Sequence, residues 1–309
     1  MILSFLFLAV LFLLLGWSAD LVVVNLRKTG EKLGIKVFFL GLLLGLFTSS
    51  PETALGINTI VKDIEEISVG NLLGGIMVIF GLVLSLSLVL NRKTATDGKI
   101  SHIFPVLLFL LLPMLLGLDG MIGFIDGIAL ILGYVGLVWY LYKVNGGYDS
   151  FAVEVVEKRD ILKHLFKIVL GIIFVIIVSH YIVQVTIDML GSLNVSKFFI
   201  GTIIFAIGTN LPEIIISLRS WRRNLGELSV SNLIGSALAN VLIIGLLATF
   251  KVLSIDNGLS YSILFVALLT LFGLLTIFYK TDNKLGRVEG VVLFLVYLGF
   301  VATEVYFLR

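Results

Sequence analysis

The stretch "TSSPETALG", from Thr48 to Gly56, interrupts a long apolar run that otherwise has the composition of a membrane helix. A near copy, "TNLPEIIIS", occurs 161 residues later, from Thr209 to Ser217. Proline inside a helix removes one N–H hydrogen bond and displaces the carbonyl four residues earlier. Because lipid cannot satisfy a freed carbonyl, each copy predicts a helix break that faces protein, water or a cation.

The composition places the whole chain in a membrane. Of its 309 residues, 59% are hydrophobic, and the mean hydropathy is +1.14, which excludes an ordinary soluble domain. The short alternating segments of a membrane β-barrel are absent from the sequence. The chain has no cysteine, so disulfides, thiolate metal sites and cysteine nucleophiles are excluded. We therefore expect an all-α polytopic membrane protein.

Apolar runs between polar or glycine-containing breaks predict ten transmembrane helices. The fourth is the shortest, and the turn "GLDGM" that follows it is tight. The predicted spans are 2–25, 37–61, 67–91, 102–117, 121–142, 163–189, 198–220, 228–250, 258–279 and 287–308.

Basic residues are distributed unevenly among the loops between these spans. Eighteen of the 22 lysines and arginines fall in the odd-numbered loops, and the exceptions are Lys62, Lys197, Lys251 and Arg309. The positive-inside rule makes the odd-numbered loops cytoplasmic. We therefore expect a multi-pass protein of the cell membrane with both termini extracellular.

The two halves of the chain align when one is shifted by 161 residues. The shift pairs "SVGNLLGG" (68–75) with "SVSNLIGS" (229–236), and it pairs Pro51 with Pro212, two of only four prolines. The copies lie five spans apart, an odd offset, so they run in opposite directions across the membrane. This predicts two inverted-topology repeats of five helices, 1–142 and 163–309, joined by a cytoplasmic linker at 143–162 within one membrane domain.

Each proline is followed by a carboxylate, Glu52 or Glu213. A charge at membrane depth costs at least about 2.5–3.5 kcal/mol, and such residues are usually functional. Inverted repeats place a transporter's binding site near the midplane, where the two copies meet. Two carboxylates, freed carbonyls and hydroxyls would form an oxygen-rich cage suited to hard cations such as Ca²⁺. A protonated or locally paired carboxyl used only in packing is the alternative, but it leaves the duplication unexplained.

Other residues of the repeat have simpler interpretations. The spacings Gly70 to Gly74 and Ser231 to Gly235 are typical of close helix packing. Asn71 and Asn232 each follow a turn closely, so we expect helix-end caps rather than cation ligands.

The stretch "FFIGTIIFAIGTNLPEIIIS" followed by "SVSNLIGSALAN" resembles the alpha-repeat of the sodium/calcium exchanger superfamily, the cation/calcium antiporters, in a divergent prokaryotic type. The first copy resembles it more loosely, and the ten helices extend the resemblance over nearly the whole chain. The resemblance implies alternating access around a cation site. By position, it implies that the cation ligands are Thr48, Ser49, Glu52, Thr209, Asn210, Glu213, Ser236 and Asn240, with backbone carbonyls near Gly45 and Ala206.

The sequence departs from the family pattern mainly in the third span. There "GGIMVI" places Gly75 and Ile79 where the family usually has serine and asparagine. Asn210 replaces a hydroxyl, and Asn240 stands where many exchangers carry aspartate. The expected cage is therefore lopsided, and the resemblance leaves open whether the first repeat still supports Ca²⁺ binding.

The leading hypothesis is a secondary active antiporter that exchanges Na⁺ for Ca²⁺ between the two motif helices. A proton- or sodium-coupled exchanger of another cation, or a degenerate relative that does not transport, remains an alternative. An enzyme is disfavoured because there is no HExxH motif and the three histidines, at 102, 164 and 180, are far apart. We expect no cofactor and no nucleic acid, with inorganic cations and the lipid bilayer as partners of a monomer.

Overall fold

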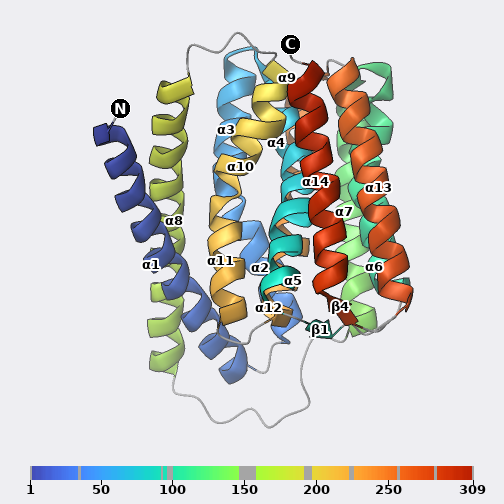
Figure 1. The fold of residues 1–309 in the computed structure, drawn as a ribbon. Helices are drawn as coiled ribbons and strands as arrows, with labels where there is room; N and C mark the ends of the chain where they lie inside the picture. The colour runs from blue at the N-terminus through green and yellow to red at the C-terminus, as the bar shows by residue number, and fades with distance from the viewer. Residues whose placement is uncertain are drawn as a thin grey trace. The chain divides into compact units, whose positions relative to one another are not determined.

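The computed structural model describes residues 2–33, 36–91, 93–95, 100–145, 158–190, 197–222, 226–255, 258–281 and 284–307. Long helices dominate this part of the chain (Figure 1). In chain order the helical stretches are α1 (Ile2–Leu33), α2 and α3 (Val37–Thr48, Ser50–Val61), α4, η1 and α5 (Glu65–Met77, Val78–Leu84, Ser85–Asn91), α6 (Ile100–Leu116), α7 (Phe124–Asn145), α8 (Lys158–Leu190), α9, η3, α10 and α11 (Lys197–Phe199, Ile200–Phe205, Ala206–Thr209, Leu211–Arg222), α12 (Gly226–Phe250), α13 (Leu259–Thr281) and α14 (Arg287–Phe307).

These stretches confirm the prediction of a polytopic helical membrane protein. Nine of the described stretches are long and apolar enough to cross a membrane, and a tenth, Ile103–Asp119, is shorter, as predicted for the fourth span. Helices α1 and α8 extend beyond the predicted ends because they continue into charged sequence, where hydropathy gives no signal. Residues 146–157 of the predicted linker lie outside the described residues, so the limits of the two repeats stay a prediction.

The two copies of the proline motif interrupt their helices at matched positions. The second span breaks at Ser49, between α2 and α3, and the seventh breaks at Asn210, between α10 and α11. These residues are 161 positions apart. The carbonyl of Phe47, which Pro51 deprives of its helical partner, accepts a hydrogen bond from Ser50 Oγ at 2.5 Å. The predicted breaks are therefore present, and a local hydroxyl satisfies one of the freed carbonyls.

The chain divides into two compact units, and each of them contains segments from both halves of the sequence. Unit 1 comprises Met1–Pro51, Tyr142–Asn194 and Gly208–Ser236, and unit 2 comprises Glu52–Leu141, Val195–Ile207 and Ala237–Arg309. The boundaries of these units therefore differ from those of the predicted sequence repeats. The first motif contributes to both units, because one boundary falls between Pro51 and Glu52, whereas the second motif, Thr209 to Ser217, lies wholly in unit 1.

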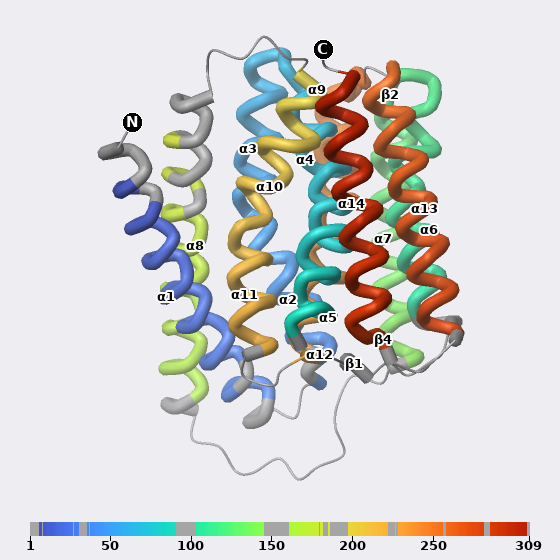
Figure 2. The backbone as a smooth tube through the Cα atoms, viewed as in Figure 1, coloured from blue at the N-terminus to red at the C-terminus, as the bar shows by residue number. Residues whose placement is uncertain are grey.

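In unit 1, α1 and α8 cross and pack against each other (Figures 1 and 2). Their apolar faces share a buried cluster with α2, α11 and the start of α12, which includes Val22, Leu44, Ile172, Ile216 and Leu228. The backbones of α2 and α12 approach closely. A Cβ atom added to Gly235 would lie 2.6 Å from the carbonyl oxygen of Leu42, so the predicted packing of small residues is confirmed here.

In unit 2, α4 packs against α9 and η3, and α14 packs against α5, η1 and α13. Gly74 of α4 allows the close approach, since a Cβ atom there would lie 2.5 Å from the carbonyl oxygen of Thr202. Two short antiparallel pairs join the helix ends: β1 (Lys93–Ala95) with β4 (Lys284–Gly286), and β2 (Met121–Ile122) with β3 (Leu253–Ser254). The turn η2 (Gly117–Asp119) follows α6.

The prediction that Asn71 and Asn232 cap helix ends is wrong. Asn71 lies within α4, whose N-cap is Ile64, and Asn232 lies within α12, which begins at Gly226. Both side chains are fully buried. The helices begin at Glu65 and Gly226, six residues before the two asparagines, because Glu65, Glu66 and Glu227 are good helix formers that an apolar pattern does not detect.

Candidate cation-binding site

In unit 1, several hydrogen-bond donors lie close to the carbonyl oxygen of Gly45. It accepts hydrogen bonds from the Ser49 N–H at 3.1 Å, Ser49 Oγ at 2.9 Å and Thr48 Oγ1 at 3.2 Å. Ser236 Oγ of α12 also donates to it, at 3.4 Å. Both hydroxyls reach back to this oxygen from the C-terminus of α2, where Thr48 is the last helical residue and Ser49 is the C-cap. Four donors exceed the two lone pairs of one carbonyl oxygen, so the hydroxyls compete for it.

Glu213 joins this cluster from the start of α11. Its side chain is fully buried, and its Oε1 accepts a hydrogen bond from Ser236 Oγ at 3.1 Å. The Thr48 side chain also contacts its carboxylate. Ser236 thus lies between the Gly45 carbonyl and the Glu213 carboxylate. Among the described residues, Glu213 Oε2 has no hydrogen-bond partner.

The second break supplies Thr209 and Asn210 to the same unit. Both side chains are buried, and the carbonyl of Asn210 accepts the Ile214 N–H at 3.0 Å, which restarts the helix after the break. Seven predicted site residues therefore belong to unit 1: Gly45, Thr48, Ser49, Thr209, Asn210, Glu213 and Ser236.

The remaining three predicted residues, Glu52, Ala206 and Asn240, belong to unit 2, and all three are buried. Asn240 Nδ2 donates to the carbonyl of Leu72 at 3.2 Å. This contact joins α12 to α4 and leaves the side-chain oxygen as an acceptor, with the amide orientation assigned from the hydrogen bond. Ala206 directly follows η3, and its N–H bonds to the carbonyl of Gly201, five residues earlier.

The third span is as apolar as its sequence indicated. Ile79 is fully buried within η1, a π-helical segment, and Gly75 lies one turn before it in α4. A second π-helical segment, η3, precedes Ala206 in the seventh span. No sequence pattern predicted either segment. π-helical segments occur frequently at functional sites, and these two lie in the spans that carry Ile79 and Ala206.

The described residues contain no group of three or more histidine, cysteine, aspartate or glutamate side chains placed to hold a metal ion. A cation bound near Glu213 would therefore depend on hydroxyl, amide and carbonyl oxygens. Such neutral oxygens, together with a few carboxylates, suit hard cations rather than soft ones.

Sequence reasoning gave no role to three buried serines of α11 and α12, Ser217, Ser220 and Ser229, and interpreted the buried Asn232 as a helix cap. Ser217 and Ser220 follow Glu213 by four and seven residues, and Asn232 and Ser229 precede Ser236 by the same intervals. Such spacing places each set on one helix face. This periodicity of polar residues in otherwise apolar helices is the sequence signal that could have identified them.

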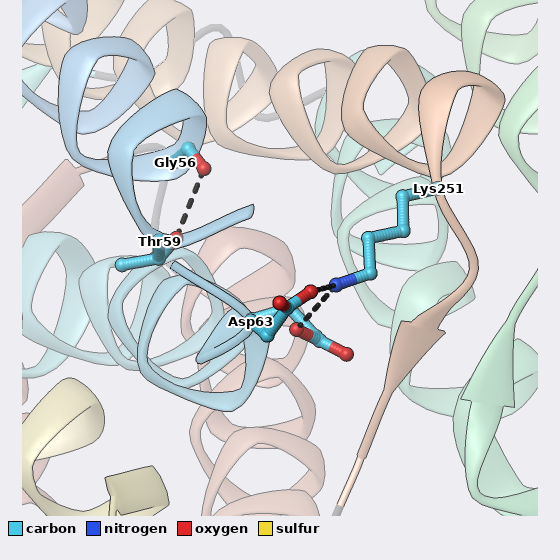
Figure 3. Close-up of polar contacts among 5 residues, drawn as sticks. Gly56, Thr59, Asp63 and Lys251 are labelled. Carbon is cyan, nitrogen blue, oxygen red and sulfur yellow. Dashed lines mark hydrogen bonds and ion pairs between the residues drawn. The ribbon is translucent and has the colours of Figure 1, made fainter. Parts of the chain in front are cut away.

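An ion pair lies just after the C-terminus of α3, the helix that follows the first break. Lys251 Nζ, just after α12, donates to Asp63 Oδ1 at 2.5 Å and to Glu65 Oε2 at 3.2 Å (Figure 3). The hydrogen bond from Lys251 and its positive charge hold the pKa of Asp63 below its usual value. The hydrogen bond to Asp63 raises the pKa of Lys251 in turn. Asp63 adopts a positive φ of 54° that reverses the chain before α4.

Comparison with known proteins gives a family match over nearly the whole chain. The family model described as sodium/calcium exchanger protein matches residues 3–143 and 163–306. The sodium/calcium exchanger MaX1 of Methanosarcina acetivorans is 25% identical over 344 aligned positions, which cover 97% of each chain. An uncharacterized membrane protein of Methanocaldococcus jannaschii is 26% identical, with 94% of each chain covered.

A solved structure shares the architecture. The sodium-calcium exchanger NCX_Mj, soaked with Na⁺ and Sr²⁺, superimposes with a TM-score of 0.81 at 25% sequence identity. The superposition covers 98% of this chain and 99% of that one. The similarity therefore extends over the full length of both proteins.

Proposed function

Because the chain belongs to the sodium/calcium exchanger family, as its repeats indicated, we propose that it is a secondary active antiporter that exchanges Na⁺ for Ca²⁺. The family and the relatives support cation antiport as the general activity. The pair of exchanged ions and the ligands are the finer part of the proposal. The supporting observation is the cluster of oxygens around Gly45 and Glu213.

In this proposal the hydroxyls around the Gly45 carbonyl serve as cation ligands. A hydroxyl that donates its proton to a carbonyl still has lone pairs to offer. The Thr48, Ser49 and Ser236 hydroxyl oxygens lie 3.2, 2.9 and 3.4 Å from this one oxygen, so a cation would meet them together with the carbonyl. Glu213, held by Ser236 at 3.1 Å, would supply the negative charge. This combination of ligands is typical of Ca²⁺ and Na⁺ sites.

The other ligands enter the proposal from the sequence repeat. Thr209 and Asn210 match Thr48 and Ser49, and Glu52 matches Glu213. With Asn240 and the carbonyl near Ala206, they would complete the set of ten. Two glutamates balance one divalent ion or two monovalent ions, so the same pair of carboxylates could bind Ca²⁺ and Na⁺ in turn. The uneven distribution of polar ligands keeps proton coupling, or another cation, as the second candidate.

The proposed setting is a cell membrane with both termini extracellular and the chain acting as a monomer. It rests on the 18 basic residues of the odd-numbered loops. The orientation can be tested by cysteine labelling, because the chain has no native cysteine. A single cysteine near residue 28 should be labelled from the cytoplasmic side of the membrane, and one near residue 309 from the extracellular side.

The decisive experiment is counterflow in proteoliposomes. Uptake of radioactive calcium is driven first by an outward sodium gradient and then by a proton gradient. Glu213→Gln and Glu52→Gln should each lower uptake by at least about 100-fold, since loss of one partner from a buried charged cluster costs roughly 3 kcal/mol or more. Uptake under the sodium gradient alone supports sodium coupling, and uptake under the proton gradient alone supports the second candidate.

Glu304→Gln is the matched control. Glu304 is also a buried glutamate that accepts a serine hydrogen bond, from Ser260 Oγ at 2.9 Å, but it lies on α14 outside the proposed ligand set. Its variant should keep the wild-type uptake. Wild-type protein that moves neither calcium nor manganese under either gradient would show that the chain is a non-transporting relative.

A further inference from the structure

Four polar residues, Ser217, Ser220, Ser229 and Asn232, form a set in unit 1 that we call the polar ladder. All four side chains are buried with 1% or less of their surface exposed. Among the described residues, the three hydroxyls and both polar atoms of the Asn232 amide have no hydrogen-bond partner. A buried polar group without a partner lowers stability, so groups of this kind in a native protein usually meet water or a ligand.

The ladder serines differ from several other buried hydroxyls of the described chain, although Ser68 Oγ also has no hydrogen-bond partner there. Ser18, Thr29 and Ser85 each donate to the carbonyl of their own helix four residues earlier, at 2.8, 2.8 and 2.6 Å. This local bond is the common way to bury a hydroxyl in a membrane helix. Because the ladder serines do not make it, their protons remain available to another partner.

The ladder runs from Glu213 toward the connection between α11 and α12. The two helices form an antiparallel pair, fixed at one end by the bond from Ser236 Oγ to Glu213 Oε1. At the other end the Trp221 ring packs on Gly226, where an added Cβ atom would lie 3.2 Å from it. Ser217 and Ser220 follow Glu213 by four and seven residues, and Asn232 and Ser229 precede Ser236 by the same intervals, so all four residues come between these two contacts along the chain.

We propose that the polar ladder is a hydrated route along which a cation passes between Glu213 and the membrane surface at the α11–α12 connection. The inference rests on the proposed cation transport, and it assigns a role to residues outside the ten proposed ligands. Hydroxyl and amide oxygens at each level replace part of the hydration shell of a hard cation without binding it tightly. Neutral ligands suit transit because the ion must also leave.

The absence of native cysteine gives a direct test of hydration. Ser217→Cys, Ser220→Cys and Ser229→Cys are each reconstituted, treated with a cationic, membrane-impermeant methanethiosulfonate from either side, and measured by intact mass. Ser85→Cys is the matched control, since Ser85 is equally buried but bonded within its own helix. The ladder cysteines should react at least about tenfold faster than the control, because only the thiolate reacts and a thiol needs water to ionise.

Added Ca²⁺ should slow the labelling of the ladder cysteines and leave that of the control unchanged. Labelling at the control rate in variants that remain folded, measured by thermal unfolding, would overturn the proposal. The assay does not depend on flux. Fast labelling in a protein that transports no cation would therefore support the hydrated route and refute only the proposed antiport.

A second variant separates transit from packing. Asn232→Leu replaces an unpartnered amide by an apolar group of similar size, so thermal stability should stay the same or rise. Cation flux should fall by about tenfold because one level of the route loses its oxygen. Unchanged flux in this variant would show that Asn232 is a packing residue and would also overturn the proposal.

Discussion

The helix pairs that follow the two motifs share one plan and differ in chemistry. After Glu213 the second repeat has Ser217 and Ser220 on α11, and α12 carries Ser229 and Asn232 before Ser236, which is bonded to the glutamate. The matched positions after Glu52 are Gly56, Thr59, Asn71, Ser68 and Gly75. The second pair is polar at every level, whereas the first has glycine at two of them.

Apolar contacts take over part of the first pair. In unit 2 a Cβ atom added to Gly56 would lie 2.6 Å from Leu247 Cδ1 and 3.1 Å from Ser68 Oγ, so a leucine packs where the second repeat has a hydroxyl. Thr59 Oγ1 donates to the Gly56 carbonyl at 2.9 Å, a bond within its own helix (Figure 3). The second hairpin thus keeps the three ladder hydroxyls without a partner among the described residues, whereas the first has a locally bonded Thr59, a glycine at residue 56 and one unpartnered hydroxyl, Ser68. Duplication therefore preserved the fold of the hairpin without preserving its polarity.

The largest effect on stability is expected at Gly45, where the backbones of α2 and α12 approach closely. Gly45 matches Ala206, and a Cβ atom on Gly45 would lie 2.6 Å from the carbonyl oxygen of Asn232. Gly45→Ala should destabilise the protein by about 1–3 kcal/mol because the backbones must separate. The reverse change, Ala206→Gly, should cost only about 0.5–1 kcal/mol. Thermal unfolding in detergent compares the two, and an equal or smaller cost for Gly45→Ala would mean that α2 and α12 can move apart freely.

An intermediate effect is expected from restoring polarity to the third span. Gly75→Ser combined with Ile79→Asn gives the first repeat the side chains that Ser236 and Asn240 provide in the second. Divalent affinity should rise by about tenfold, equivalent to about 1.4 kcal/mol of added ligand interaction. Isothermal titration with Ca²⁺ measures it, and Ser236→Gly with Asn240→Ile is the opposite control. Weaker binding in the first double variant would mean that Gly75 and Ile79 lie away from the cation.

The smallest effect is expected at the Lys251 ion pair, which links a residue of each repeat and has no counterpart at the matched positions, because those positions are Asn224 and Leu90. Lys251→Met should lower thermal stability slightly, because exposed ion pairs contribute little and are screened by salt. Asp63 has a lowered pKa in the folded protein, so its contribution is present above its unfolded pKa and is lost as the pH falls through the folded value.

The pH dependence gives the measurement. Thermal unfolding of the wild type and of Lys251→Met should differ near pH 7 and converge in acid, below the ordinary Asp63 pKa of 3.8. Lys251 itself has a raised pKa, so its contribution is lost only as the pH rises through that value, above its ordinary 10.5. A difference that persists in acid would show that the lysine stem, rather than its charge, stabilises this end of unit 2.

The features that the sequence predicted are those with local causes. Hydropathy identified the spans, and Pro51 and Pro212 marked the breaks at Ser49 and Asn210, because proline removes a hydrogen bond wherever it occurs in a helix. The small-residue spacings predicted the close approaches of helices at Gly74 and Gly235. This cause is local too, because glycine has no side chain wherever it occurs.

The features that the sequence did not predict depend on tertiary packing. Asn71 and Asn232 suggested caps, yet each lies buried within a helix whose start is set by charged residues. The Gly45 carbonyl was expected near the site, but the convergence of Thr48, Ser49 and Ser236 on it depends on how α12 packs against α2. The contact between α2 and α12 depends on residues throughout both helices, so no single position in the sequence predicts it.

The π-helical segment η1 also sets a limit to the internal symmetry. An α-helix turns about 100° per residue, and a π segment closes its hydrogen bonds one residue later. Residues after a π segment therefore point in a different direction from the matched residues of a helix that has no such segment. Before η1 the matched Asn71 and Asn232 are both fully buried. After it, Ser85 is fully buried, whereas its counterpart Leu246 is 41% exposed. The 161-residue shift therefore aligns the same faces of the third and eighth spans only as far as η1. Beyond that segment it still pairs residues in sequence, but they face different surroundings.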